Sequence, residues 1–328
     1  MRLTWAGYSG KGVGLIEVDA NNLSSILYLN KVSDGVYKIS TQGLNAQIQS
    51  GNNTPVQATA ETGADHTFSV LTAQVVSIRA KLDDSNGYWF RSSWGNAPES
   101  IITWAVTSDV AKWSVEPATS VDITLTAAND NTSAAHTYAT LCVPFNITGL
   151  TGVESKEVNA YAPTKSGSYI VPGDGATTVT AGTPVLLIGE EGATSVTATI
   201  GSSYATSPAT TNVLTGTFTG TSINCASGST NYVLGFDSDN DNRIGFYHVS
   251  GGSSFALKAN RAYLNTGGVV EVKGFAINWN DIVDGIETID NGQLTIDNDK
   301  AIFNLAGQRI NKLQRGVNIV NGKKVLVK

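Results

Sequence analysis

The sequence predicts an all-β protein of three successive modules, and three observations support this prediction. Short apolar alternations recur along the 328 residues, separated by Gly, Asn, Ser, Thr and Pro, a composition typical of strands joined by tight turns. Hydrophobic residues make up 41% of the chain and charged residues only 15%, which favours buried sheets over a disordered segment. An aromatic strand in the first third recurs roughly every 40 residues, which indicates a repeated unit.

The repeated unit is clearest around Phe68 and Trp113. These residues occupy the same place in two copies that lie 45 residues apart, and a fainter copy places Leu27 41 residues before Phe68. Each copy has an apolar alternation and a glycine-led second strand, and each closes on the aromatic strand. Units of this size cannot bury their apolar faces singly, so three copies predict a threefold closed structure over residues 1–118, with the three residues meeting inside.

This pattern resembles the ricin-type β-trefoil, whose repeats end in a strand carrying a core tryptophan. The Gln-x-Trp signature of that family is not kept, because Ala111-Lys112 precede Trp113. The aspartate that takes sugar hydroxyls in sugar-binding members is also missing, since Tyr88-Trp89-Phe90-Arg91 stand at its place in the third unit. The resemblance implies a trefoil and, as an expectation, binding of a glycan or of a host or cell-surface polysaccharide.

The first repeat is shorter than the others, with only 26 residues before Leu27. About one strand is therefore missing, and we expect an incomplete trefoil. We also expect that upstream sequence, including a signal peptide absent from this chain, was lost before Met1.

Four aromatic residues of the third repeat are candidates for a ligand surface, because large amphipathic side chains stack on the apolar face of a sugar ring. They are Tyr88, Trp89, Trp94 and Trp104. Trp94 lies in a turn-like setting that favours exposure. The alternative is that Trp89, like Trp113, fills the core of the module.

Residues 119–283 predict an antiparallel β-sandwich, because many short alternating runs follow one another with turn residues between them. Some of these sequence segments resemble a module found in secreted proteins of Bacteroides-type bacteria, for example Gly245-Phe246-Tyr247 and Ala259-Asn260-Arg261-Ala262-Tyr263-Leu264. That resemblance carries no catalytic residue set. The module is therefore expected to act as a scaffold or spacer.

The only candidate for a cofactor is a calcium ion at Asp237, Asp239 and Asp241. Alternate oxygen-bearing side chains can converge on calcium, which accepts 6 to 8 oxygen ligands in flexible geometry. The segment lies between two expected strands, has Arg243 where a glycine turn is expected, and lacks a closing glutamate. A plain hairpin turn is the alternative, since Asp and Asn are good turn formers.

Residues 284–328 predict a small C-terminal β-domain. Two strands flank Asn321-Gly322, which is a strong signal for a two-residue β-hairpin. The pattern from Asn304-Leu305-Ala306-Gly307-Gln308-Arg309 to the final hairpin is similar to the sorting domain by which Bacteroidetes route proteins through type IX secretion or to the cell surface. The resemblance implies a secretion machinery as partner and a secreted or cell-surface location.

No catalytic constellation is visible in the sequence. His66, His136 and His248 are far apart and show no metal-binding spacing, so each is expected at the surface or at a strand end. Cys142 and Cys225 are the only cysteines and form no disulfide framework. Two buried free thiols or one disulfide bridge remain as alternatives.

The charge distribution gives no support for a nucleic-acid partner. The chain carries a net charge of −6, while residues 300–328 hold seven basic and no acidic residues and lack interleaved aromatics. No apolar run is long enough to cross a bilayer, so we expect no membrane span.

Together these features predict a non-enzymatic, exported or cell-surface protein with a carbohydrate-binding trefoil, a scaffold and a sorting tail. A second hypothesis makes these the accessory modules of a larger secreted hydrolase whose catalytic domain lay upstream of Met1. A third is a structural or adhesive surface protein without a small ligand.

Overall fold

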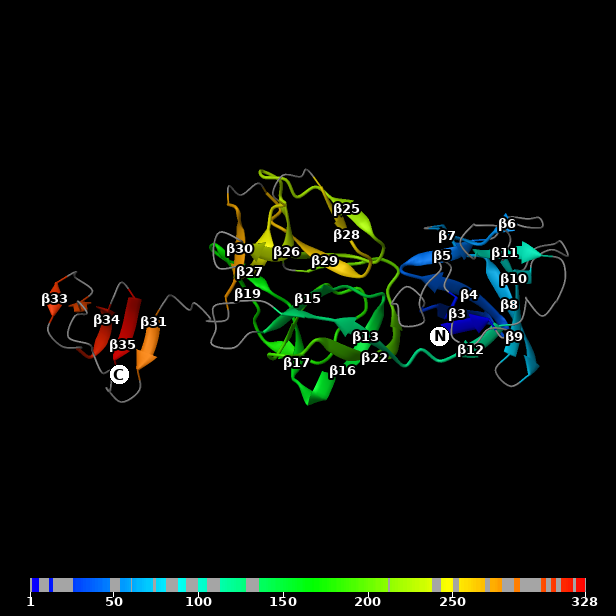
Figure 1. The fold of residues 1–328 in the computed structure, drawn as a ribbon, viewed down its shortest axis with the longest axis horizontal. Coiled ribbons are helices and arrows are strands. Elements are labelled where there is room, and N and C mark those ends of the chain that lie inside the picture. Colours follow the sequence, from blue (N-terminus) through cyan, green and yellow to red (C-terminus); the bar gives the residue numbers. More distant parts are fainter. Residues whose placement is uncertain are drawn as a thin grey trace. The chain divides into compact units, whose positions relative to one another are not determined.

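The fold is that of a computed structural model, and it is almost entirely β (Figure 1). The structure describes residues 2–5, 12–13, 26–47, 54–59, 61–72, 75–80, 88–92, 100–104, 113–127, 136–211, 213–237, 243–249, 254–268, 272–278, 286–289, 302–304, 308–310, 314–320 and 323–327. A single 3₁₀ turn, Val153–Ser155, is the helical element among them, and no helix in these ranges could cross a bilayer. The chain divides into two compact units, Met1–Asn278 and Trp279–Lys328.

The N-terminal module is built on one 12-stranded sheet. Its strands are β1 (Arg2–Trp5), β2 (Gly12–Val13), β3 (Tyr28–Ser33), β4 (Val36–Thr41), β5 (Leu44–Gln47), β6 (Thr54–Pro55), β7 (Gln57–Thr59), β8 (Asp65–Thr72), β9 (Val75–Ala80), β10 (Tyr88–Ser92), β11 (Ser100–Trp104) and β12 (Trp113–Glu116). The longest run of neighbouring strands is β2-β1-β12-β9-β8-β4-β5-β7, and β3 also pairs with β4. The sheet curls into a half-barrel, and no pairing between described strands joins β3 back to β1.

The repeat found in the sequence returns as a repeat of strand pairing. The strand after Leu27 pairs antiparallel with β4, the strand with Phe68 pairs with β9, and the strand with Trp113 pairs with β1. The links β4 to β8 and β9 to β12 then join one copy to the next. The three similar sequence segments therefore correspond to three similar pairs of antiparallel strands in this module.

Two of the three residues expected in the shared core are fully buried. Leu27 and Trp113 have no exposed surface, whereas Phe68 is only half-buried and packs edge-on against Tyr37 at 5.2 Å. The fully buried residue of β8 is His66. The core is completed by apolar residues of neighbouring strands, Ile39, Ala46, Ile78 and Trp89.

The N-terminal module contacts the middle of the chain through β3, β4 and the turn after β4. Ile26 belongs to the apolar core cluster of residues 118–200. Tyr28 stacks on Tyr204 at 4.2 Å, and the Tyr204 hydroxyl accepts a hydrogen bond of 3.0 Å from the Gly43 backbone N–H. Gly43 has φ +77°, and a Cβ there would meet the Thr206 carbonyl oxygen at 2.7 Å, so glycine is needed for this approach.

The middle of the chain forms three layers, where the sequence predicted a sandwich (Figure 1). One outer layer is β13 (Ser120–Thr124), β22 (Ser195–Tyr204) and β16 (Phe145–Gly152). The central layer is β14 (Thr126–Ala127), β15 (Thr137–Leu141), β21 (Val185–Gly189), β17 (Val158–Tyr161) and β20 (Gly175–Ala176). The other outer layer is β18 (Thr164–Ser166), β19 (Tyr169–Val171), β30 (Gly274–Ile277), β27 (Arg243–Tyr247), β26 (Asn231–Asp237), β29 (Arg261–Asn265), β24 (Leu214–Thr217) and β23 (Thr210–Thr211). A two-stranded ribbon of β25 (Thr221–Ile223) and β28 (Phe255–Leu257) completes the module.

Strand β21, in the middle of the central layer, is buried on both faces, which explains its sequence. All five of its residues are buried, and the run Val185-Leu186-Leu187-Ile188 is continuously apolar rather than alternating. Val185 and Leu187 pack in the core shared with the three-stranded layer, so Leu186 and Ile188 point toward the eight-stranded layer. A strand that is covered on both faces favours such a continuous apolar run over alternation.

The C-terminal unit is a five-stranded sheet in the order β31-β35-β34-β32-β33. Its strands are β31 (Ile286–Ile289), β32 (Ile302–Asn304), β33 (Arg309–Ile310), β34 (Gly316–Val320) and β35 (Lys323–Val327). Val320 pairs directly with Lys323, so the predicted hairpin at residues 321–322 is confirmed. The expected strand at residues 293–296 lies outside the described residues. The buried side chain of Asn318 fixes the turn before β34 by donating to the carbonyls of Gln314 and Gly316.

Candidate ligand-binding site

A cavity of about 270 Å³ opens between the central layer and the eight-stranded layer of the middle module. Tyr138 and Thr140 of β15 line one side, and Leu234 and Phe236 of β26 line the other. Leu234 and Phe236 are two residues apart, so they project from the same face of their strand. Ile244 of β27 is the cross-strand partner of Phe236 and lines the same wall. Strand alternation therefore collects apolar side chains on this wall.

Two phenylalanines at the cavity are unusually exposed. Phe236 keeps 47% of its surface accessible and Phe255 of the β25–β28 ribbon keeps 37%. Both line the cavity together with Leu257. Exposed aromatic residues beside a concave apolar surface are typical of a binding site, since soluble proteins usually bury large aromatic side chains that bind nothing.

Arg261, at the start of β29, also lines the cavity. Its Nη1 donates a hydrogen bond of 3.0 Å to the Thr140 carbonyl oxygen, and the Thr140 hydroxyl accepts one of 3.2 Å from the Ala262 backbone N–H. Both contacts tie β29 to β15. Burial lowers the pKa of the Arg261 guanidinium, and no described acidic residue forms an ion pair with it.

The remaining polar lining is basic or hydroxylic. Lys258 lines the cavity and is exposed, and Thr124 and Thr126 contribute hydroxyl groups. Among the residues that the structure describes, the lining contains no carboxylate, carboxamide, imidazole or thiol. These described side chains supply cations and hydroxyl groups, and they include neither a nucleophile paired with a base nor a set of metal ligands.

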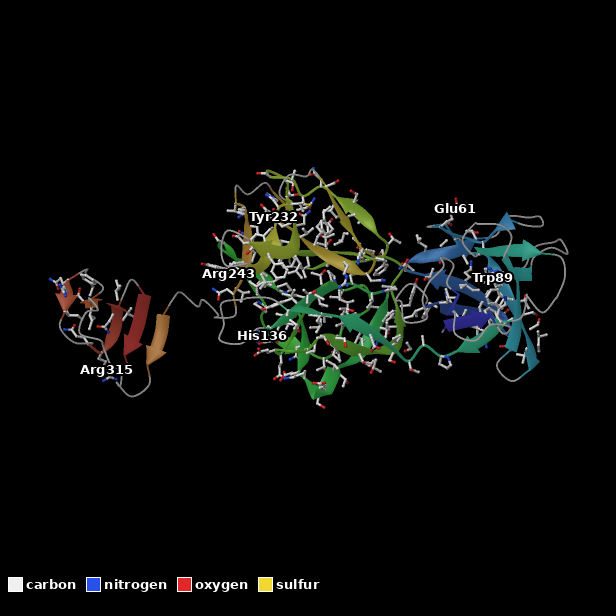
Figure 2. The ribbon with its side chains drawn as sticks, in the orientation of Figure 1. Glu61, Trp89, His136, Tyr232, Arg243 and Arg315 are labelled. Carbon is white, nitrogen blue, oxygen red and sulfur yellow. The ribbon has the colours of Figure 1, made fainter. Side chains whose placement is uncertain are left out.

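The aromatic residues predicted to bind a ligand are not equivalent in the structure. Trp89 has no exposed surface, and its carbonyl oxygen accepts a hydrogen bond of 3.0 Å from Trp113 Nε1 (Figure 2 labels Trp89). Because it fills the core of the N-terminal module, Trp89 is removed from the candidate ligand surface. Tyr88 and Trp104 are direct partners in the β10–β11 pairing. Trp94 lies outside the described residues.

Of the three residues predicted to bind calcium, the structure describes only Asp237. Its carboxylate forms an ion pair with Lys273 at 2.5 Å, and its cross-strand partner is Arg243. The positive charges of Lys273 and Arg243 beside this carboxylate disfavour binding of a calcium ion there. Asp239 and Asp241 lie outside the described residues, and within the described ranges no cluster of three or more His, Cys, Asp or Glu could hold a metal ion.

His66 contradicts the expectation of a surface or strand-end histidine. It is fully buried in β8, edge-on to Trp89 at 5.2 Å, and neither ring nitrogen has a hydrogen-bond partner. Desolvation lowers its pKa to about 4, while the nearby carbonyls of Ala64 and Tyr37 and the carboxylate of Asp65 offset only part of this effect. His136 and His248 do lie at strand ends, directly before β15 and directly after β27.

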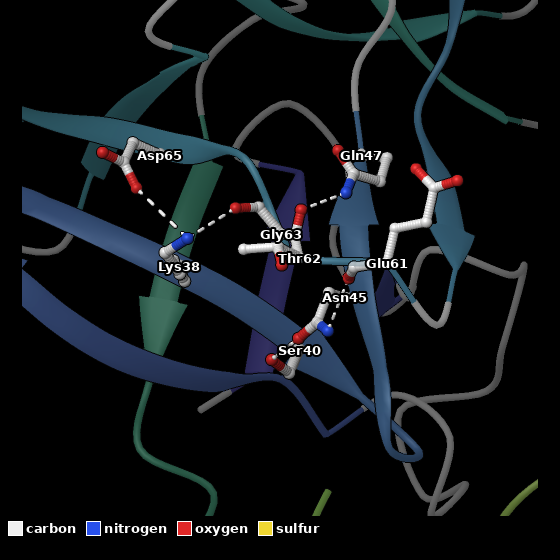
Figure 3. Close-up of polar contacts among 8 residues, drawn as sticks. All are labelled: Lys38, Ser40, Asn45, Gln47, Glu61, Thr62, Gly63 and Asp65. Atoms are coloured by element: carbon white, nitrogen blue, oxygen red, sulfur yellow. Dashed lines mark hydrogen bonds and ion pairs between the residues drawn. The ribbon is translucent and has the colours of Figure 1, made fainter.

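The chain segment that leads into His66 is held by polar contacts (Figure 3). Three side chains of β4 and β5 donate to its carbonyls: Lys38 to Gly63 at 2.8 Å, Asn45 to Glu61 at 2.8 Å, and Gln47 to Thr62. Lys38 also lies 3.8 Å from the Asp65 carboxylate. Side chains of β4 and β5 therefore hold the segment from which His66 projects.

Both cysteines are free and buried, so of the two alternatives the structure has the free thiols. Burial raises the pKa of Cys142 to about 12. A thiol with so high a pKa is protonated and unreactive at neutral pH. Cys142 is therefore a packing residue, and a Cβ at Gly216 would collide with its sulfur.

Arg261 is a residue whose place at the cavity was not predicted from the sequence, where it only forms part of the segment Ala259-Asn260-Arg261-Ala262-Tyr263-Leu264. The signal that could have found it is the pattern Arg261-Ala262-Tyr263-Leu264, in which an arginine opens a strand that is otherwise apolar.

Comparison of the chain with protein-family models, with curated proteins and with solved structures gave no match.

Proposed function

We propose that this chain is a non-enzymatic, exported or cell-surface protein that binds a small ligand in the cavity between β15 and β26. The observation that carries the proposal is the combination of an open apolar cavity with two exposed phenylalanines, Phe236 and Phe255, at its lining. Export is supported by the resemblance of residues 284–328 to a sorting domain. The alternative that these modules are accessories of a larger secreted hydrolase is compatible with the same binding role.

The experiment that tests this function uses a neutral fluorescent probe of apolar sites, N-phenyl-1-naphthylamine. We expect the wild-type protein to bind the probe and Ala256→Trp to weaken binding at least about tenfold, because the indole would fill the cavity. Ala256 lines the cavity, is exposed and lies in the two-stranded ribbon, so the larger side chain leaves the core untouched.

Ala127→Trp is the matched control. Ala127 is also exposed and lies in β14, but it does not line the cavity. The control should bind the probe like the wild type. Equal binding by the two variants, or no binding by the wild type, would refute the proposed site.

A second candidate function is glycan binding by the N-terminal module. The observation that favours it is the register of the β10–β11 hairpin, which sets the aromatic residues Tyr88 and Trp104 directly opposite each other. This candidate rests on the resemblance of residues 1–118 to a β-trefoil.

A further inference from the structure

We propose that the ligand of the cavity is an amphipathic anion, with an apolar body between β15 and β26 and one anionic head group on Arg261. The inference rests on the proposed function, because it names the chemical class that the same cavity takes. A carboxylate and a phosphate monoester share this chemistry, since an arginine fork pairs with either.

Arg261 is a cation with few partners of its own. A guanidinium carries five N–H donors, and among the described residues one acceptor serves it, the Thr140 carbonyl oxygen. No carboxylate belongs to the described lining of the cavity, and none of the described ion pairs includes Arg261. A half-buried cation without a counter-charge is costly, so its retention at an open cavity points to an anion supplied from outside.

The described lining of the cavity is positively charged. Lys258 adds a second cation to Arg261, and the part of the lining that the structure describes holds no acidic residue, although the whole chain carries a net charge of −6. A positive cavity on an acidic protein selects for negative ligands and against cations.

The body of the ligand faces a mostly apolar wall. Leu234, Phe236, Ile244, Phe255 and Leu257 supply it, so most contacts with the described lining are apolar. Besides two cations, the polar side chains of the described lining are only threonine and tyrosine hydroxyl groups. A sugar needs a polar partner for each of several hydroxyl groups, so the described lining suits a hydrocarbon or aromatic body better than a sugar.

The test is displacement of N-phenyl-1-naphthylamine from the 328-residue chain by four ligands with a ten-carbon chain, each below its micelle-forming concentration. Decanoate and decyl phosphate carry the anion, methyl decanoate removes it, and decyltrimethylammonium reverses the charge. We expect decanoate to bind at least about tenfold more tightly than its methyl ester, and the cationic ligand to bind weakest. The ratio of decanoate to decyl phosphate identifies the preferred head group.

Variants then locate the charge. Arg261→Gln should bring decanoate and methyl decanoate to the same affinity by weakening decanoate alone. Lys258→Gln should have a smaller effect in the same direction, because this lysine is exposed. Lys165→Gln, which removes an exposed charge of β18 away from the lining, should change nothing.

The outcomes separate the two proposals. If the ester binds the wild type as tightly as decanoate and Ala256→Trp blocks both, the cavity is a binding site and the inference of an anion is wrong. If no ligand displaces the probe and Ala256→Trp has no effect, the binding function itself fails. Should Arg261→Gln not fold, the comparison of the four ligands on the wild type still decides.

Discussion

His66 is a histidine held neutral inside the N-terminal module. Its ring is fully buried without hydrogen-bond partners, and burial lowers its pKa to about 4 from an ordinary value of 6.5. The unfolded chain therefore takes up a proton as the pH falls through 6.5, whereas the folded chain does so only near pH 4. The contribution of His66 to stability is complete above pH 6.5 and is lost between these two values.

We expect the free energy of unfolding of the N-terminal module to fall by up to about 3 kcal/mol between pH 6.5 and pH 4 because of this residue. Urea unfolding followed by tryptophan fluorescence measures it, because five of the six tryptophans lie in residues 1–118. His66→Leu should remove this part of the pH dependence, while His136→Gln should retain it. An unchanged pH profile in His66→Leu would contradict the assignment.

Residue roles were the least predictable level, because burial of a polar side chain leaves no trace in a strand pattern. His66 occupies an inward position of β8 that the sequence assigned to Phe68. The role of Arg261 depends on what lies across the cavity, 121 residues away at Thr140. The two readings of Trp89, core or surface, could be separated only by the contacts of β10 with its neighbours.

The strands themselves were largely predictable, since each depends on local alternation and local turn residues. β4, β9, β13, β22 and β29 all begin within two residues of an alternating run in the sequence. What local patterns could not predict is pairing between distant strands. The parallel pairs β19–β30 and β31–β35, and the third layer that buries β21 on its second face, depend on contacts that no short segment encodes.

The hairpin of β10 and β11 is the element on which glycan binding depends. If Tyr88 and Trp104 stack on a sugar, Trp104→Ala should weaken binding on a glycan array at least about tenfold, since a tryptophan anchor dominates such contacts. Val70→Ala is the control, because Val70 is 76% exposed in the same module and lies on β8. A wild-type protein that binds no glycan would remove this candidate.

At the scale of the molecule, the chain is a series of β sheets that fall into two compact units. The N-terminal half-barrel shares packing with the middle module through Ile26 and the stacked pair Tyr28 and Tyr204, within one compact unit. The C-terminal sheet is a separate compact unit with its own strand order. Binding and export can therefore be assigned to separate units and tested separately.

Residues 279–328 should carry the export signal by themselves. A reporter with a signal peptide and this tail, expressed in a Bacteroides-type host with type IX secretion, should reach the cell surface or the medium. The same reporter without the tail, or with β35 deleted, should stay in the periplasm, because β35 pairs with two strands of the sheet. Equal export of all three reporters would show that the tail is not a sorting signal.

The position of β35 in that sheet also sets the order in which its strands can assemble. Residues 323–327 lie between β31 and β34, so among the described strands the first and the later strands of the unit are joined through them. Until these residues are available, β31 lacks the neighbour with which it pairs in parallel. The C-terminal sheet is thus completed from its middle, when residues 323–327 pair with β31 on one side and β34 on the other.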